Sequence, residues 1–300
     1  MNEFHKSVLL KDSVEGLKIK PNGIYVDVTF GGGGHSREII KSIIEGKLIA
    51  FDQDKEAIKN KIIDKKNFMI FNKNFKNLKT QLNSINIFAI DGLIADLGVS
   101  AYQFTDNERG FSLKYDANLD MRMDQDLEKT AFDVINKYNR ENLSRIFKDY
   151  ADFKNPNFIV DEIISSRNSK IIQTTFDLKK IFNNKTIGLK DNKFFARIFQ
   201  AIRIEINDEI NILKELLSQS LELLRPKGRL VVLSYHSAED KIVKSFMKYG
   251  NFLNTPKKDF FGNISTPFRL VTKKPIVPSV TEINQNNKSR SAKLRICEKL

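Results

Sequence analysis

Glycines and carboxylates stand where strand-like segments of the first hundred residues end. Four consecutive glycines follow the apolar segment GIYVDVTF (23–30), which contains Asp27. Asp52 lies at the end of GKLIAFDQD (46–54), and Asp96 lies in DGLIADLGVS (91–100). Glycines let the backbone approach a ligand closely, and a carboxylate can accept both hydroxyl groups of a ribose in charge-assisted hydrogen bonds. The pattern predicts a site for a ligand that contains a nucleoside.

The glycine loop does not fit the two common phosphate-binding motifs. The dinucleotide fingerprint G-x-G-x-x-G requires a third glycine. Counted from Gly31 this position is Ser36, and counted from Gly32 it is Arg37. The P-loop pattern G-x-x-x-x-G-K-[ST] is also missing from this loop. A pyrophosphate is therefore not the expected ligand.

The remaining pattern is Asp27-x-x-x-Gly31-x-Gly33. It is similar to the first motif of S-adenosylmethionine-dependent methyltransferases, whose methyl donor carries no pyrophosphate. Asp52 could hold the ribose of this donor or that of a nicotinamide cofactor. A nicotinamide-dependent oxidoreductase therefore stays open as an alternative, although the incomplete fingerprint argues against it.

The elements that must position these residues alternate along the chain. Strand patterns at residues 23–30, 46–54, 68–75 and 91–100 are separated by helical patterns, and GRLVVLSYHS (228–237) and SAKLRICEKL (291–300) predict later strands. Such alternation predicts an α/β fold, with a parallel sheet and helices on both faces. Ligands bind such sheets at the carboxyl ends of the strands.

The alternation stops near residue 105, where several helical patterns follow one another without a strand. We therefore expect a discontinuous domain, residues 1–104 and 196–300, interrupted by a helical insertion at 105–195. The segment 254–290 (NTPKKDFFGNISTPFRLVTKKPIVPSVTEINQNNKSR) is expected to be irregular loop.

The composition restricts the partners. A net charge of +13 favours a polyanion such as nucleic acid. One cysteine and three histidines are too few for a Cys/His zinc site, so no metal is expected. No run of about 18 apolar residues predicts a membrane span, and the first residues do not resemble a signal peptide. These features favour the cytoplasm.

A series of motifs then narrows the identification. The segments HKSVLL, DVTFGGGGHS, FDQD, DGLIADLGVS, ERGFS, LDMRMD, FQAIRIEIN, GRLVVLSYHSAEDKIVK and RSAKLRI occur in this order. Together they resemble the ribosomal small-subunit methyltransferase H family over nearly the whole chain. The resemblance implies a Rossmann-like S-adenosylmethionine-dependent methyltransferase sheet with an inserted helical substrate-recognition domain. It also implies methylation at N4 of a cytidine in the decoding region of small-subunit (16S) ribosomal RNA.

Carried over by position, the resemblance implies a set of contacts to the methyl donor. These residues are Gly33, Gly34, His35, Asp52, Phe75, Asp96 and Gln103. Two segments depart from the family pattern. KFFARIFQA stands where a His-Pro-Ala-Thr-Arg stretch usually precedes FQA, and SYHSAEDK replaces the more usual Phe-His-Ser-Leu-Glu-Asp-Arg. Both departures concern substrate contacts more than the donor loop.

Two candidates for catalysis keep alternative roles. Asp96 could face the amine of the cytosine, face the donor, or cap the turn that follows its strand. His236 could hydrogen-bond the base, position a phosphate, or be structural. Arg109, Arg122 and Arg197 are candidates for substrate binding. Another RNA or DNA as acceptor, and a homodimer as the assembly, also stay open.

Overall fold

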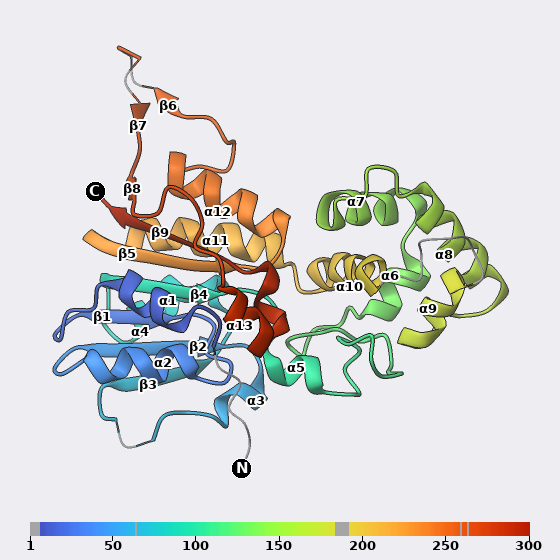
Figure 1. Cartoon of the computed structure of the whole chain (residues 1–300), viewed down its shortest axis with the longest axis horizontal. Coiled ribbons are helices and arrows are strands. Elements are labelled where there is room, and N and C mark those ends of the chain that lie inside the picture. Colours follow the sequence, from blue (N-terminus) through green and yellow to red (C-terminus); the bar gives the residue numbers. More distant parts are fainter. Residues whose placement is uncertain (1–6, 64, 184–191, 259, 263) are drawn as a thin grey trace. The chain divides into compact units, whose positions relative to one another are not determined.

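A computed structural model describes residues 7–63, 65–183, 192–258, 260–262 and 264–300 (Figure 1). The chain forms two compact units. The first contains the described residues up to Gly98 together with Asn211–Leu300, and the second is Val99–Ile210. The first two residues of the HKSVLL motif, His5 and Lys6, lie outside the described residues.

The first unit is built on a seven-stranded sheet, within the part of the chain that the structure describes. Its order is β3-β2-β1-β4-β5-β9-β8. The strands are β1 (Ile24–Asp27), β2 (Lys47–Asp52), β3 (Phe68–Asn72), β4 (Ile90–Asp96), β5 (Leu224–Ser234), β8 (Phe268–Leu270) and β9 (Lys293–Lys299). The first five are parallel, as expected, whereas β9 runs antiparallel to both β5 and β8.

Side chains alternate between two apolar cores, one on each face of this sheet. In β4, Leu93 and Ala95 belong to one core and Ile94 to the other. This period of two is that of a strand buried on both faces. The first core is completed by α4 (Leu78–Ser84), α11 (Glu209–Leu223) and α12 (Ser237–Tyr249), and the second by α1 (Leu10–Leu17) and α2 (Gly34–Ile39).

Shorter elements connect these layers. They are α3 (Lys55–Ile58) and the 3-10 helices η1 (Ile40–Ser42), η2 (Phe75–Asn77) and η3 (Asn287–Ser291). The expectation of irregular loop after residue 254 is wrong in part. That segment contains the hairpin β6 (Lys257–Lys258) and β7 (Ile264–Ser265), the sheet strand β8, and α13 (Val280–Gln285). Phe268 of β8 packs into the core, so a single buried ring anchors a strand too short to show a pattern.

The second unit is helical. It contains α5 (Ala101–Thr105), α6 (Ala131–Lys137), α7 (Arg140–Ala151), α8 (Asn157–Ser169), α9 (Thr175–Asn183) and α10 (Asn192–Ile206) around a core of their own. The expected insertion, 105–195, lies inside this unit. The unit ends later than expected because α10 is one continuous helix that packs on α7.

A break separates α10 from α11. Asp208 has a left-handed backbone (φ +49°), and the side chain of Asn207 binds the carbonyl of Met121 and the N–H of Met123. This break explains why one long apolar sequence forms two helices. None of the described helices combines the length and apolar composition needed to cross a bilayer.

Candidate active site at the carboxyl ends of the strands

Three carboxyl groups lie at the ends of three adjacent strands. Asp52 ends β2, Asp27 ends β1 and Asp96 ends β4. The chain passes from β1 to β2 and β3 on one side and then returns to β4 on the other. β1 and β4 therefore flank the point where the strand order reverses, which is where open α/β sheets bind ligands. The predicted strand-end acids are thus brought to one edge of the sheet.

Asp52 is joined to the glycine loop. Its Oδ2 accepts a hydrogen bond from the N–H of Gly31 at 2.7 Å, and its Oδ1 accepts one from the N–H of Asp54 at 2.9 Å. Burial raises the pKa of Asp52 to about 6, against the opposing effect of these two hydrogen bonds. Each carboxylate oxygen has a second lone pair for a ligand hydroxyl.

The glycine loop turns sharply between β1 and α2. Gly31 and Gly33 have left-handed backbones, with φ of +51° and +76°, which side chains disfavour. A Cβ at Gly33 would clash with the guanidinium of Arg37 and lie 2.7 Å from the Phe30 ring. A Cβ at Gly31 or Gly32 would have no atom within 4 Å. The loop therefore leaves space above its backbone at Gly31 and Gly32.

Asp27 forms hydrogen bonds with residues on both sides of the glycine loop. It is 1% exposed, its Oδ2 accepts the hydroxyl of Ser36 at 2.6 Å, and its Oδ1 accepts the N–H of Thr29 at 3.1 Å. Burial raises its pKa, while the nearby His35 and the hydrogen bonds from Ser36 and Thr29 lower it. The acid of the glycine motif thus fixes the turn.

Asp96 is held from three sides. Its Oδ1 accepts the Tyr235 phenol at 2.7 Å, its Oδ2 lies 3.7 Å from Nδ1 of His35, and its N–H donates to the Thr29 hydroxyl at 2.6 Å. Burial raises the pKa of Asp96, and His35 and Tyr235 counteract this. As a half-buried carboxyl at a strand end, Asp96 is suited to meet a ligand that carries positive charge.

The other predicted donor residues differ in their surroundings. His35 is 4% exposed, and its Nε2 lies 3.3 Å from the carbonyl of Val8, so its ring is buried between Val8 and Asp96. Phe75 begins η2 and packs partly buried against the core. Gln103 lies in the helical unit, where it forms a capping box with Ser100 at the start of α5.

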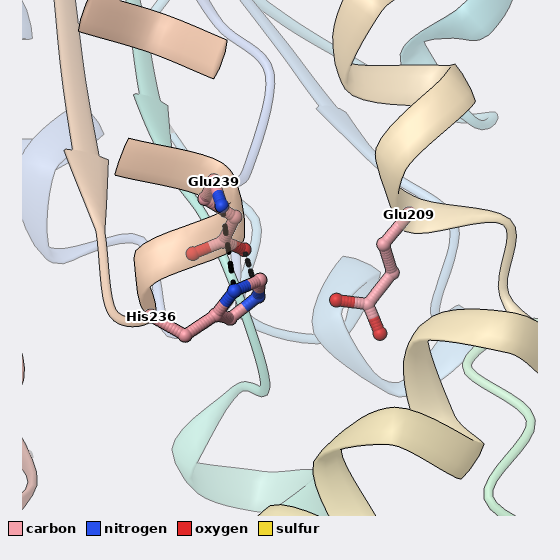
Figure 2. A group of neighbouring side chains, drawn as sticks. All are labelled: Glu209, His236 and Glu239. Carbon is pink, nitrogen blue, oxygen red and sulfur yellow. Dashed lines mark hydrogen bonds and ion pairs between the residues drawn. The ribbon is translucent and has the colours of Figure 1, made fainter. Parts of the chain in front are cut away.

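His236 begins the helix that follows β5, and Figure 2 shows its ring beside Glu239. Its Nδ1 accepts the N–H of Glu239 at 3.4 Å, and its Nε2 lies 3.1 Å from Oε1 of the same residue. The first turn of α12 carries two acids, as expected of a helix N-terminus. The imidazole is therefore the N-cap of α12, which favours the structural interpretation of this residue.

The three candidate arginines bind groups of their own unit. Arg109, 6% exposed, donates to the carbonyls of Arg122 and Met123. Arg122 donates to both carboxylate oxygens of Asp120 and to the carbonyls of Gln125 and Leu127.

Arg197 is committed in the same way. It donates twice to the carbonyl of Ala151 and lies over the Phe153 ring at 3.8 Å from its centroid. These partners favour a structural role for all three arginines.

Tyr235, Thr29 and Ser36 were not singled out from the sequence, although they hold the two acids of β1 and β4. Tyr235 follows β5 directly and is next to His236, so its position after a strand was the available signal. Hydroxyl groups at strand ends are common, and only the fold shows which carboxylate each one meets.

Comparisons with known proteins find relatives that match nearly the whole chain. The family model described as the MraW methylase family matches residues 2–300. Ribosomal RNA small subunit methyltransferase H of Christiangramia forsetii is 51% identical over 299 residues, which cover 99% of this chain and 98% of the relative. The protein of the same name from Flavobacterium johnsoniae is 50% identical over 299 residues, with the same coverage.

A solved structure is more distant. An rRNA methylase from Streptococcus thermophilus is 13% identical, with a TM-score of 0.43, and the match covers 97% of this chain and 93% of that one.

Proposed function

Since the chain belongs to the MraW methylase family, we propose that it is an S-adenosylmethionine-dependent methyltransferase whose acceptor is N4 of a cytidine in the decoding region of 16S ribosomal RNA. The family membership confirms the resemblance drawn from the sequence. The net charge of +13 suits a protein that works on the small ribosomal subunit. We place the reaction in the cytoplasm.

The observation that supports the donor site best is the connection between Asp52 and the glycine loop. A ribose whose hydroxyls bind Asp52 would lie beside the open backbone at Gly31 and Gly32. In this arrangement Gly33 and Gly34 contact the methionine part of the donor, and Phe75 lies near its adenine. We extend the donor contacts to His35, Asp96 and Gln103 on the resemblance alone.

The chemistry requires positioning more than it requires a strong base. The amino group of cytosine is a poor nucleophile, because its lone pair is delocalised into the ring. The donor supplies an activated methyl group on a sulfonium. The protein must hold N4 about 3–3.5 Å from that carbon, in line with the bond that breaks. N4 gains the methyl group and releases a proton to water, and the bond between sulfur and the methyl carbon breaks, so that the donor leaves as the neutral thioether.

Asp96 is the residue that we assign to this step. As a carboxylate at the end of β4, it can accept a hydrogen bond from the amino group or stabilise the positive charge that develops on nitrogen. His236 is occupied as the N-cap of α12, so we leave it out of the catalytic group. Arg109, Arg122 and Arg197 are left out of the substrate contacts because their guanidinium groups bind the protein itself.

The test uses labelled S-adenosylmethionine and small subunits from cells that lack this enzyme, with free ribosomal RNA alongside. The RNA is digested and its nucleosides are separated by mass spectrometry. N4-methylcytidine is expected with the parent protein and is expected to be lost in Asp96→Ala. The exposed Asp149→Asn in α7 serves as the control. Label in another nucleoside would reject the cytidine-N4 assignment, and no label despite donor binding would indicate another acceptor, such as DNA.

A further inference from the structure

Tyr235 connects β5 to the carboxylate of β4. β4 and β5 are parallel neighbours in which Asp96 pairs with Leu233. Tyr235 lies two residues further on, where its phenol reaches back to Asp96 Oδ1 at 2.7 Å. Its own N–H donates to Glu239 Oε2 at 2.9 Å, in the first turn of α12. Tyr235 is thus held both through its backbone N–H and through its phenol hydroxyl.

The two oxygens of Asp96 have different neighbours. Oδ1 receives the phenol of Tyr235, whereas Oδ2 faces Nδ1 of His35 at 3.7 Å. The N–H of Asp96 is bound to Thr29, which is joined in turn to Asp27. One orientation of the carboxylate satisfies all these groups. Without the phenol, Oδ1 would lose the only hydrogen bond that the described residues give it.

We propose that Tyr235 is a positioning residue for methyl transfer: its phenol fixes the orientation of the Asp96 carboxylate in the donor site. The proposal rests on the proposed function, because it deepens the role of Asp96 in that reaction. Tyr235 acts through Asp96 and makes no contact of its own with the reacting atoms.

The charged groups around Asp96 determine in which direction the loss of the Tyr235 phenol changes the pKa of Asp96. Burial, Asp27 of β1 and Glu239 of α12 raise the pKa of Asp96, whereas His35 of α2 and the phenol of Tyr235 lower it. The pKa of Tyr235 is raised well above its usual value by burial and by Asp96, with Glu239 and Glu282 of α13 adding to this. The phenol therefore remains a donor at every working pH, and its removal raises the pKa of Asp96.

The test is Tyr235→Phe, which removes one oxygen and leaves the ring. Donor affinity is measured by calorimetry from acidic to alkaline pH, without RNA. We expect an affinity about tenfold below the parent on the acidic side, in line with the loss of a hydrogen bond to a charged group. The parent affinity returns on the alkaline side, where Asp96 ionises without help. The rate of methyl transfer should shift along the pH axis in the same way.

Two further variants make the test specific. Tyr25→Phe removes another buried phenol, which accepts the N–H of Lys20 at 2.7 Å, and should leave the pH dependence unchanged. In the Asp96→Asn background, adding Tyr235→Phe should cause no further loss of donor affinity, because the two residues act as a unit. An equal loss of donor affinity in Tyr235→Phe at every pH, or additive losses of affinity in the double variant, would overturn the proposal. Failure to form N4-methylcytidine would instead count against the proposed function, since donor binding is read separately.

Discussion

Oδ2 of Asp52 accepts a 2.7 Å hydrogen bond from the N–H of Gly31, so the carboxylate that ends β2 and the turn that follows β1 are held together. A ligand that binds this carboxylate is thereby placed against the glycine loop. The geometry of the site therefore depends on the charge of Asp52, because a protonated carboxyl accepts the hydrogen bond from Gly31 less well.

Donor affinity should therefore fall as the pH falls through about 6, the pKa to which burial raises Asp52. On the proposed assignment, the group above that pH is a carboxylate that would bind both ribose hydroxyls, and below it the added proton would weaken these bonds. Calorimetric titrations with S-adenosylmethionine between acidic and neutral pH measure this. In Asp52→Asn, affinity at neutral pH should be about ten- to a hundredfold lower, since a hydrogen bond to a charged group contributes about 1.5–3 kcal/mol.

The Asn variant also identifies the titrating group. It cannot ionise, so the part of the pH dependence that belongs to Asp52 should disappear. A parent protein that binds the donor equally well on both sides of about pH 6 would contradict the assignment of Asp52 to the ribose.

Gly33→Ala should reduce both stability and donor affinity. The left-handed backbone at Gly33 costs a residue with a side chain about 1–2 kcal/mol, and the new Cβ would clash with Arg37 and crowd Phe30. Thermal unfolding and calorimetry measure the two effects. Gly32→Ala is the matched control for stability, because a Cβ there has free space and no positive φ to adopt. Equal unfolding temperatures of the two variants would show that the turn adapts easily.

The ion pair between Asp240 of α12 and Arg295 of β9 should stabilise the packing of this helix against the sheet. Arg295 Nε lies 2.6 Å from Asp240 Oδ1, both side chains are nearly buried, and Lys293 joins them at 3.1 Å. Asp240→Asn leaves Arg295 without its counter-charge and should lower the free energy of unfolding by about 3 kcal/mol at neutral pH. Glu15→Gln, in the exposed Lys11–Glu15 pair, should change it by less than about 0.5 kcal/mol.

The stabilisation by Asp240 should also depend on pH. Burial alone would raise its pKa, but Arg295 and Lys293 outweigh burial and hold the pKa below its usual value of 3.8. A lowered pKa in the folded state means that the stabilisation is complete above the usual value and is lost as the pH falls through the folded value. The difference between the parent and Asp240→Asn in urea unfolding should therefore shrink under acidic conditions. A constant difference would contradict the ionic origin.

The strand-end acids could be predicted from the sequence because two features coincide at each of them. An apolar run predicts a strand, and parallel strands bring their carboxyl ends to one edge. Asp52 and Asp96 needed no further information. The hydrogen bond from Tyr235 could not be predicted, since it joins residues 139 positions apart in the sequence. Their proximity follows only from the pairing of β4 with β5.

The partners of the arginines could not be predicted, although the arginines themselves were easy to identify as candidates. A guanidinium suits a phosphate, a carboxylate, a carbonyl or an aromatic ring equally well, so the residue type alone does not select its partner. In a basic chain that is expected to bind RNA, a phosphate is the expected partner. In the fold, Arg197 instead binds a carbonyl at the end of α7 and packs on the ring of Phe153.

Strand β8 could not be predicted for a related reason. It is short, and its place in the sheet depends on β9, which follows it in the chain.

Arg197→Met should therefore weaken the helical unit and leave RNA binding intact. It removes two hydrogen bonds to the Ala151 carbonyl and the contact with Phe153, a loss of about 1–3 kcal/mol in the free energy of unfolding. Affinity for small-subunit RNA, measured at several salt concentrations, should keep the slope of the parent. A phosphate contact would instead reduce that slope by about one. Lys148→Met, at an exposed position of α7, controls for the loss of one positive charge without the loss of packing. A reduced slope in Arg197→Met but not in Lys148→Met would return Arg197 to the substrate site.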